Sequence, residues 1–484
     1  MFISGKFIPF LLLFCAGSIL QLKAQNSVQI NSNTISEASA ETDTSQVLLI
    51  IGDVRVTGYK KTKLYIIQRE IPFKTGEYIL RNDLEKKIEL CRQQLMNTSL
   101  FVDVEVKIAR EQDNIVFIDI VTKERWYLFP VPYFKIVDRN LNQWLVEHNA
   151  SLQRINYGLK FTQYNVSGRN DKFNLWLVNG YTQQFTIRYD NPFIDKKLKS
   201  GINFGVSYSR NREINYITDP DSSKQKFYKD ENRFLRRNFH VELGYSYRPA
   251  IRTRHIFRIS YTDDKVDDTV LALNPSYFKE EVNNVKYPSF SYHLYYFNVD
   301  YIPYPLKGFM GDAHFYKRDI GKKNNIWELG GKGTYTIPVF EKSYMQFQAA
   351  GVIKLPFKQP YYAQGMFGGS DFFMRGLEYH VIDGVAGGFA RATAIRQLLS
   401  WNIKSPIKSK SHDKIPLRIY GKAYSDAGYS YNPNENKSML NNKLLKTWGM
   451  GVDIVTFYDI VLKIEYSFNQ LGKSGLFIHS KSDF

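Results

Sequence analysis

The sequence predicts a transmembrane antiparallel β-barrel of about 16 strands, preceded by one small α+β domain. From about residue 150 onward, apolar and polar residues alternate in runs long enough for a tilted membrane strand, which needs about 9 to 11 residues. The aromatic share of 15% suits the aromatic girdles of such barrels. Beyond the N-terminus the sequence has no run of about 20 apolar residues, the length that a transmembrane helix requires.

Residues 1–24 are predicted to be a secretory signal peptide. Lys6 supplies the positive charge, residues 7–20 are mostly apolar, and Leu22-Lys23-Ala24 fits a cleavage site. Residues 25–46 are rich in Ser, Thr, Asn and Gln and are expected to form a flexible tether. Cleavage would leave Cys91 as the only cysteine, so we expect no intramolecular disulfide.

Residues 47–126 are expected to form the small α+β domain, with its elements in the order β-α-α-β-β. Helical spacing of apolar residues predicts the two helices, and alternation predicts the strands after them. The expected elements are a strand over 47–56, a helix with Leu64, Ile67 and Ile71, a helix with Leu84, Ile88, Cys91 and Leu95, and strands over 101–108 and 115–121.

Residues 127–484 are expected to form the barrel. Closure of such barrels usually requires an even number of strands. Alternation predicts 15 strands, so one more is expected within 265–303 or 355–366. The 15 lie near 155–165, 170–179, 181–190, 200–212, 235–248, 252–264, 287–303, 307–317, 325–337, 343–354, 385–399, 414–426, 445–456, 459–469 and 474–484.

A glycine-rich segment at 368–377 is the most informative feature of the expected barrel. Gly368, Gly369 and Gly376 allow a loop to turn tightly, and Arg375 supplies a cation. In the strand expected over 414–426, alternation turns Asp426 toward the lumen. A bidentate contact between this guanidinium and this carboxylate would hold the loop inside the barrel.

Two motifs and the order of the first domain resemble one family. Met374-Arg375-Gly376-Leu377 resembles the Val-Arg-Gly-Phe/Tyr motif of its inward sixth loop, and Tyr424, Asp426 and Gly428 match its Phe-x-Asp-x-Gly motif. Residues 47–126, with the turn at Gly58, resemble a POTRA domain. Over roughly residues 47–484, the chain is similar to the BamA/TamA superfamily of outer-membrane assembly and translocation proteins.

The strand expected over 474–484 also resembles that family, because Phe484 ends it on an aromatic residue. This strand carries Phe477, and Gly475 would weaken its pairing at the expected seam with the strand at 155–165. The chain also departs from the family pattern. The strand after the loop carries no carboxylate at 390–397, so the contact rests on Asp426 alone or is adjusted by Gln397.

The resemblance implies an insertase for outer-membrane β-barrels, located in the outer membrane of a Gram-negative cell with its POTRA domain in the periplasm. Its implied partners are unfolded outer-membrane or secreted polypeptides and outer-membrane lipid, with accessory lipoproteins as further candidates. The POTRA domain would bind an extended polypeptide at a strand edge. The alternatives are a secretion pore of the two-partner type and a passive porin. The Arg375–Asp426 contact could act in the working cycle or be purely architectural.

An enzyme is not expected, because the common nucleophile, metalloprotease and phosphate-loop motifs are missing from the sequence. The pattern predicts no cofactor. It predicts no metal site either, since the 8 histidines form no pair at metal-ligand spacing, and His380 is expected to make a structural hydrogen bond. The net charge of +18 comes without a nucleic-acid-binding motif. Basic residues near anionic lipid headgroups explain this charge better than nucleic acid does.

Overall fold

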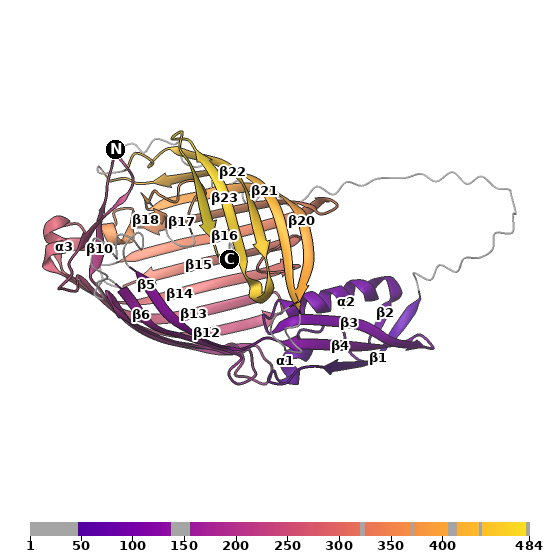
Figure 1. Ribbon diagram of the computed structural model, residues 1–484. Coiled ribbons are helices and arrows are strands. Elements are labelled where there is room, and N and C mark those ends of the chain that lie inside the picture. Colours follow the sequence, from indigo (N-terminus) through magenta and orange to yellow (C-terminus); the bar gives the residue numbers. More distant parts are fainter. Residues whose placement is uncertain are drawn as a thin grey trace, which may run out of the picture. The chain divides into compact units, whose positions relative to one another are not determined.

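The computed structural model describes residues 47–136, 155–319, 325–368, 372–404, 414–434 and 438–480. The expected signal peptide and tether, together with Gly369 and Phe484, lie outside these residues. A four-stranded sheet and a 16-stranded sheet dominate the described part of the chain (Figure 1). No helix in this part is both long and apolar enough to cross a membrane.

The four-stranded sheet belongs to the first domain and has the order β2-β1-β4-β3. β1 pairs in parallel with β4, and the other pairs are antiparallel. The elements are β1 (Leu48–Thr57), α1 (Leu64–Arg69), β2 (Tyr78–Leu80), α2 (Arg81–Met96), β3 (Phe101–Gln112) and β4 (Ile115–Glu124). The strand β2 between the helices was not expected, because its 3 residues are too few to show alternation.

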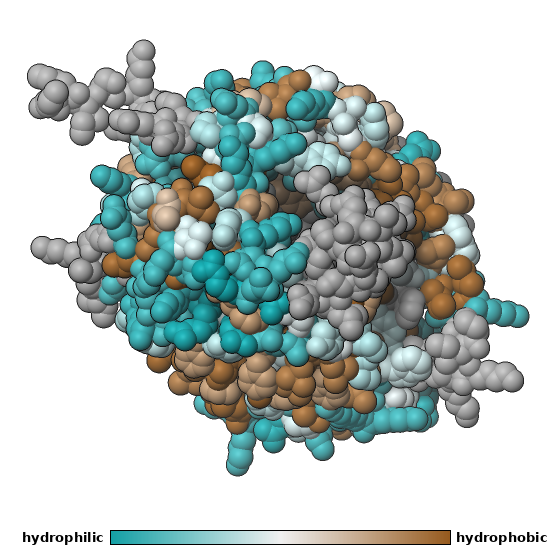
Figure 2. Space-filling model, turned by 60° about the vertical axis from the view of Figure 1, so that its left-hand side comes forward, coloured by the Kyte–Doolittle hydropathy of each residue, from teal (hydrophilic) through white to brown (hydrophobic). Residues whose placement is uncertain are grey.

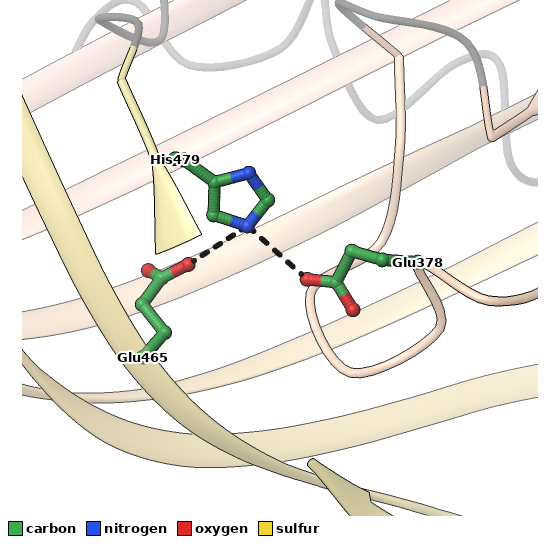
Figure 3. Close-up of side chains that lie close together, drawn as sticks. All are labelled: Glu378, Glu465 and His479. Atoms are coloured by element: carbon green, nitrogen blue, oxygen red, sulfur yellow. Dashed lines mark ion pairs between the residues drawn. The ribbon is translucent and has the colours of Figure 1, made fainter. Parts of the chain in front are cut away.

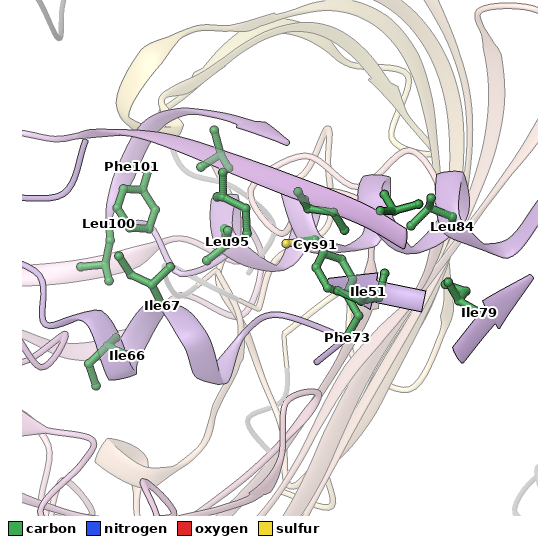
Figure 4. Packing of buried hydrophobic residues seen from close by; sticks show 14 of the residues in the cluster. Ile51, Ile66, Ile67, Phe73, Ile79, Leu84, Cys91, Leu95, Leu100 and Phe101 are labelled. Atoms are coloured by element: carbon green, nitrogen blue, oxygen red, sulfur yellow. The ribbon is translucent and has the colours of Figure 1, made fainter. Parts of the chain in front are cut away.

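The core of this domain lies between the two helices and the sheet (Figure 4). Leu84, Cys91 and Leu95 are buried on one face of α2, as their helical spacing predicts. They pack in one cluster with Ile51 of β1 and Ile67 of α1. Burial of a large apolar side chain contributes about 1.5–3 kcal/mol, so this cluster supplies the domain with a hydrophobic core of its own.

The 16-stranded sheet is antiparallel, and its strands are neighbours in the order in which they occur along the chain. Its strands are β5 (Leu128–Ile136), β6 (Ile155–Tyr164), β7 (Lys172–Gly180), β8 (Thr182–Asn191), β9 (Ser200–Asn211), β12 (Arg236–Ala250), β13 (Thr253–Val266), β14 (Asn284–Val299), β15 (Gly308–Arg318), β16 (Ile326–Phe340), β17 (Ser343–Leu355), β20 (Ala386–Lys404), β21 (Lys414–Tyr431), β22 (Leu444–Val455), β23 (Val461–Asn469) and β24 (Ser474–His479).

Shorter elements lie between these strands. They are β10 (Glu213–Thr218), β11 (Gln225–Lys229), α3 (Asp268–Leu273), η5 (Lys279–Glu281), η6 (Tyr361–Ala363), β18 (Gly365–Phe367), β19 (Ile382–Asp383) and η7 (Phe457–Asp459). The strands β10 and β11 form a hairpin between β9 and β12, and β18 pairs with β19 in the connection from β17 to β20.

The expected count of 16 antiparallel strands is confirmed, but the position of the last one was wrong. All 15 strands predicted from alternation are present, and the additional strand is β5 rather than a strand within 265–303 or 355–366. Pro130 and Pro132 concealed it, because proline is tolerated in edge strands but argues against a central one. The strand at 155–165 was expected to meet the last strand at the seam, and this is wrong as well, because β5 lies at that edge of the sheet. Among the described residues the sheet is not closed, and its edges are β5 and β24.

The two faces of the large sheet differ in chemistry. Large apolar side chains such as Leu243, Ile259 and Leu329 are exposed on one face, whereas Lys422 and Glu465 are buried on the other. Figure 2 shows hydrophobic side chains gathered in a contiguous patch beside a hydrophilic surface. An apolar outer face and a polar inner face are the arrangement expected for a membrane barrel.

The first testable prediction concerns the thiol of Cys91. It is fully buried, and burial raises its pKa to about 12. Because the thiolate is the reactive species, we expect maleimide to modify Cys91 only after unfolding in urea. Mass spectrometry of the peptide that contains Cys91 measures the rate of its modification by maleimide. Lys107→Cys, on the exposed face of β3, is the control and should react at least about 100-fold faster at pH 8. Equal rates in the folded protein would contradict the packed core.

Candidate functional site

The candidate site is the connection between β17 and β20, which folds against the polar face of the large sheet. Met374 and Leu377 of this connection are buried in one cluster with Phe389 of β20 and Leu445 of β22. The polar residues between them therefore meet the inner wall of the sheet. We refer to residues 372–380 as the inward loop.

The guanidinium of Arg375 makes a bidentate contact with the carboxylate of Asp426 on β21. Its Nε donates to Oδ2 at 2.9 Å, and its Nη2 donates to Oδ1. The Arg375 side chain is 8% exposed and that of Asp426 is 0% exposed, so the pair is screened from water. Nη2 also donates to Thr393 Oγ1 at 3.2 Å, and the guanidinium carbon lies 3.9 Å from the centre of the Tyr424 ring. The loop is thereby attached to β20 and β21.

A second arginine, which the sequence analysis did not assign, completes the surroundings of Asp426. Arg391 of β20 places its Nε 3.3 Å from Asp426 Oδ2. It also donates to Gln348 Oε1 at 2.9 Å and to the carbonyl oxygen of Phe373 in the inward loop. The strand after the loop therefore contributes a cation in place of a carboxylate. In the register of β20 and β21, Arg391 pairs with Asp426 and Gln397 pairs with Tyr420, so Arg391 rather than Gln397 lies beside the carboxylate.

Further carboxylates come from β22 and β23. Glu465 Oε1 lies 3.9 Å from Arg375 Nη1 and 2.6 Å from Lys422 Nζ. Lys422 also contacts Asp453 Oδ1 at 2.6 Å, and Tyr304 donates to the other oxygen of Asp453 at 2.9 Å. These buried charges alternate in sign, which compensates for part of their desolvation. The alternation of β23 placed Glu465 on the polar face, but local pattern does not show which cation it meets.

Two glycines allow the backbones to approach closely. Gly376 has φ +84°, and a Cβ there would lie 3.1 Å from the carbonyl oxygen of Phe468. The carbonyl of Gly376 accepts a hydrogen bond from Asn469 Nδ2 at 2.7 Å, which ties the loop to β23. A Cβ on Gly428 would overlap Met374 Sδ. Gly368 also has a positive φ, of +109°.

The remaining predicted residues lie around this loop or close to the edge of the sheet. Phe477 of β24 is buried, and its ring centre lies 5.2 Å from that of Tyr379 in the loop. The three atoms nearest to a Cβ on Gly475 belong to the rings of these two residues. His380 Nδ1 lies 3.0 Å from Ser222 O, which is the structural hydrogen bond expected for it. The arrangement holds the inward loop against β20, β21 and β23.

The second testable prediction compares the two sides of the ion pair. Asp426→Ala removes a carboxylate that Arg375 and Arg391 share, whereas Arg375→Ala leaves Asp426 in contact with Arg391. Removing one partner of a buried ion pair costs about 3–5 kcal/mol, and we expect Asp426→Ala to be the more destabilising change. Heat-modifiable gel mobility across a urea series measures the remaining folded fraction. Both variants should still fold and insert at low urea.

Two further variants sharpen this comparison. Arg375→Lys keeps the charge but loses the planar fork, so it should recover only part of the lost stability. Arg237→Ala removes an exposed arginine of β12 and should leave the unfolding midpoint unchanged. Equal midpoints for Asp426→Ala and Arg237→Ala would contradict a stabilising ion pair.

The third testable prediction concerns the contact between Gly428 and Met374. Gly428→Ala should lower the unfolding midpoint, because the added methyl group overlaps Met374 Sδ. Adding Met374→Ala makes room for that methyl group, so the double variant should be more stable than the sum of the single changes predicts. Gly365→Ala is the control, since a Cβ there has no atom within 4 Å. Strictly additive effects would show that the two positions do not touch.

Comparisons with known proteins bear on the first domain and on the whole chain. The POTRA family model, described as a surface antigen variable number repeat, matches residues 49–125. A comparison with curated proteins found no match. Among solved structures, BamA from Haemophilus ducreyi lacking POTRA domains 1–3 is similar at 14% identity and a TM-score of 0.46, over 89% of this chain and 83% of that one. CdiB from Escherichia coli is similar at 10% identity and a TM-score of 0.47, over 93% and 91%.

The POTRA match confirms the interpretation of the first domain, whose sheet and core have been described above. The described residues that follow it form the expected antiparallel sheet of 16 strands. The chain thus joins a POTRA domain at residues 49–125 to an antiparallel sheet of 16 strands, and these are the two parts expected from its resemblance to the BamA/TamA superfamily.

Proposed function

We propose that this protein inserts or translocates unfolded polypeptide at the outer membrane of a Gram-negative cell. Residues 47–126 would lie in the periplasm, and residues 127–484 would form the barrel in the membrane. One observation carries the proposal: the chain joins a POTRA domain to a 16-stranded sheet whose edge strands, β5 and β24, do not pair with each other in the described residues.

The edges of the large sheet explain how such a protein could work. A free strand edge presents backbone N–H and C=O groups that can pair with another strand. In lipid, each such group costs several kcal/mol when it has no partner. An incoming strand that pairs with an edge would satisfy these groups and begin its own sheet. Burial of its apolar side chains in lipid then favours insertion without a nucleotide cofactor.

The composition of the two edge strands favours temporary pairing between them. β24 is a short strand of 6 residues, so it can form few hydrogen bonds with a partner. In β5, Pro130 and Pro132 occupy alternate positions and lack backbone N–H groups, so both missing donors fall on the same side of the strand. A continuous ladder on that side would lack two hydrogen bonds. Pairing of this kind is easier to open than that of two strands with all their donors.

The POTRA domain offers a binding edge of its own. β3 lies at the edge of the four-stranded sheet and is its longest strand, with 12 residues. An extended polypeptide could add to β3 by main-chain hydrogen bonds, which do not depend on sequence. Such binding would suit a protein that receives many unfolded chains.

The inward loop would couple the interior of the barrel to the edge at β24. Arg375 holds the loop to β21, Asn469 holds it to β23, and Tyr379 packs on Phe477 of β24. Movement of β24 would therefore disturb the loop. We propose that the Arg375–Asp426 pair keeps the loop in one position while the edge strands open, rather than serving as an architectural clip alone.

Depletion of the protein tests the proposed function. The abundances of outer-membrane and secreted proteins are then quantified by mass spectrometry, with expression of the intact chain as the rescue control. Loss of many unrelated barrels would support insertion, and loss of a single secreted or surface protein would support a dedicated secretion pore. Unchanged abundances of both classes, with altered uptake of small solutes, would indicate a porin and overturn the proposal.

The fourth testable prediction concerns the POTRA domain. A chain lacking residues 47–126 should still give a heat-modifiable, membrane-inserted barrel, because the large sheet has its own strands and interior network. It should rescue the depleted cells poorly, since it has lost the edge at β3. The control is the intact chain expressed at the same level in the outer membrane. Full rescue by the truncated chain would contradict the role of the POTRA domain in guiding substrate.

A further inference from the structure

Three side chains of metal-binding type meet at the inner face of the large sheet (Figure 3). Glu378 comes from the inward loop, Glu465 from β23 and His479 from β24. Spacing along the sequence predicts no metal site, since these residues lie far apart in the chain and only the tertiary structure brings them together. In Figure 3 the imidazole lies between the two carboxylates, which approach it from separate segments.

The separations of the donor atoms fit a shared metal ion better than a hydrogen bond. His479 Nε2 lies 3.4 Å from Glu378 Oε1 and 3.4 Å from Glu465 Oε2. One ligand atom from each of the three residues can be chosen so that all lie within 4.8 Å of one another. Nitrogen and oxygen ligands about 2.0–2.1 Å from a tetrahedral Zn²⁺ are separated from each other by about 3.3–3.4 Å. An N–H···O hydrogen bond is shorter, with a usual separation of about 2.9 Å.

Three of the candidate donor atoms are withdrawn from water and make no hydrogen bond in the described part of the chain. This holds for both carboxylate oxygens of Glu378 and for Nε2 of His479. Burying such atoms without a hydrogen bond is costly, and a cation placed among them would offset that cost. The two carboxylate oxygens of Glu465 have different neighbours: Oε1 contacts Lys422, and Oε2 faces His479.

The three ligands are held in position by their neighbours. The His479 ring stacks on Phe373 with ring centres 5.0 Å apart, and Lys422 fixes the carboxylate of Glu465 at 2.6 Å. Partners of this kind orient metal ligands before the ion binds. Glu465 and His479 also line a cavity of about 760 Å³, which leaves room for a water ligand beside them.

The identity of the ligands narrows the choice of metal. An imidazole nitrogen suits Zn²⁺ and similar transition metals, whereas Mg²⁺ and Ca²⁺ prefer sites built from oxygen atoms alone. Lys422 and Arg375 lie near Oε1 of Glu465 and neutralise part of its negative charge. An ion held mainly by charge would therefore bind weakly at this site. A metal that gains most of its affinity from directed bonds is therefore favoured over one held by charge alone.

We propose that Glu378, Glu465 and His479 bind one divalent transition metal ion of the Zn²⁺ class. The ion ties the edge strand β24 to β23 and to the inward loop, beside the residues that contact Asp426. Metal binding would thus hold β24 in place until the ion is released. The site stands on its own geometry and does not depend on the proposed function.

The test uses the full chain, purified in detergent without a polyhistidine tag and stripped of metal by a chelator. Zn²⁺ is added, and binding is measured by competition with a fluorescent zinc indicator. We expect one site per chain, with affinity at least about tenfold weaker in His479→Ala and in Glu378→Gln. The matched control is His314→Ala, because His314 faces the single carboxylate of Glu328 at 3.2 Å. Zinc binding in this control should equal that of the parent.

Hydrogen exchange of the peptide covering residues 474–479 tests the tie to β24. Zn²⁺ should slow its exchange in the parent and in His314→Ala, but not in His479→Ala. Absence of stoichiometric zinc binding, or equal affinity in all variants, would overturn the metal site. If His479→Ala loosens β24 in zinc-free protein while the parent binds no zinc, the cluster is an ion pair only, and the metal site is again overturned. Zinc binding without slower exchange would overturn the tie to β24.

Discussion

The bidentate contact between Arg375 and Asp426 is the interaction on which the interior of the large sheet depends. A carboxylate as deeply buried as that of Asp426 is stable only where cations and hydrogen-bond donors surround it. Arg375 approaches from the inward loop and Arg391 from β20, so the charge is compensated from two directions. Because the guanidinium is planar and donates in a fixed fork, the contact also fixes the direction from which the loop arrives. The Asp426 side chain thereby fixes Arg375, and Asn469 of β23 adds a second attachment at the carbonyl of Gly376.

This contact is part of a network that reaches the last four strands of the sheet. Lys422 of β21 joins Asp453 of β22 to Glu465 of β23, and His479 of β24 faces Glu465 from the other side. Buried polar groups in such a network strengthen one another's interactions while each has a partner. Removing one group leaves its neighbours buried without a partner, which destabilises the fold. A change at β24 is therefore expected to be felt at the inward loop, through neighbours that are in direct contact.

The open edges of the sheet set the second constraint. The inner network holds β20 to β24 together, but β5 lies at the opposite edge and contributes to none of these ion pairs among the described residues. The stabilisation by these ion pairs is thus concentrated on β20 to β24 and does not extend to β5. Under the proposed function, such a distribution would keep the loop in place while a seam between β5 and β24 opens and closes.

Alternation along single strands determined most of the fold, because the inward or outward direction of a side chain repeats every two residues and is a local property. It placed 15 of the strands and turned Asp426 toward the interior. It did not find β5, where two prolines hide the pattern. It also could not show that Arg391 and Glu465 surround the ion pair, or that Glu378 meets His479. Those contacts depend on strand register and on the path of a loop, and these are decided only when distant segments pack together.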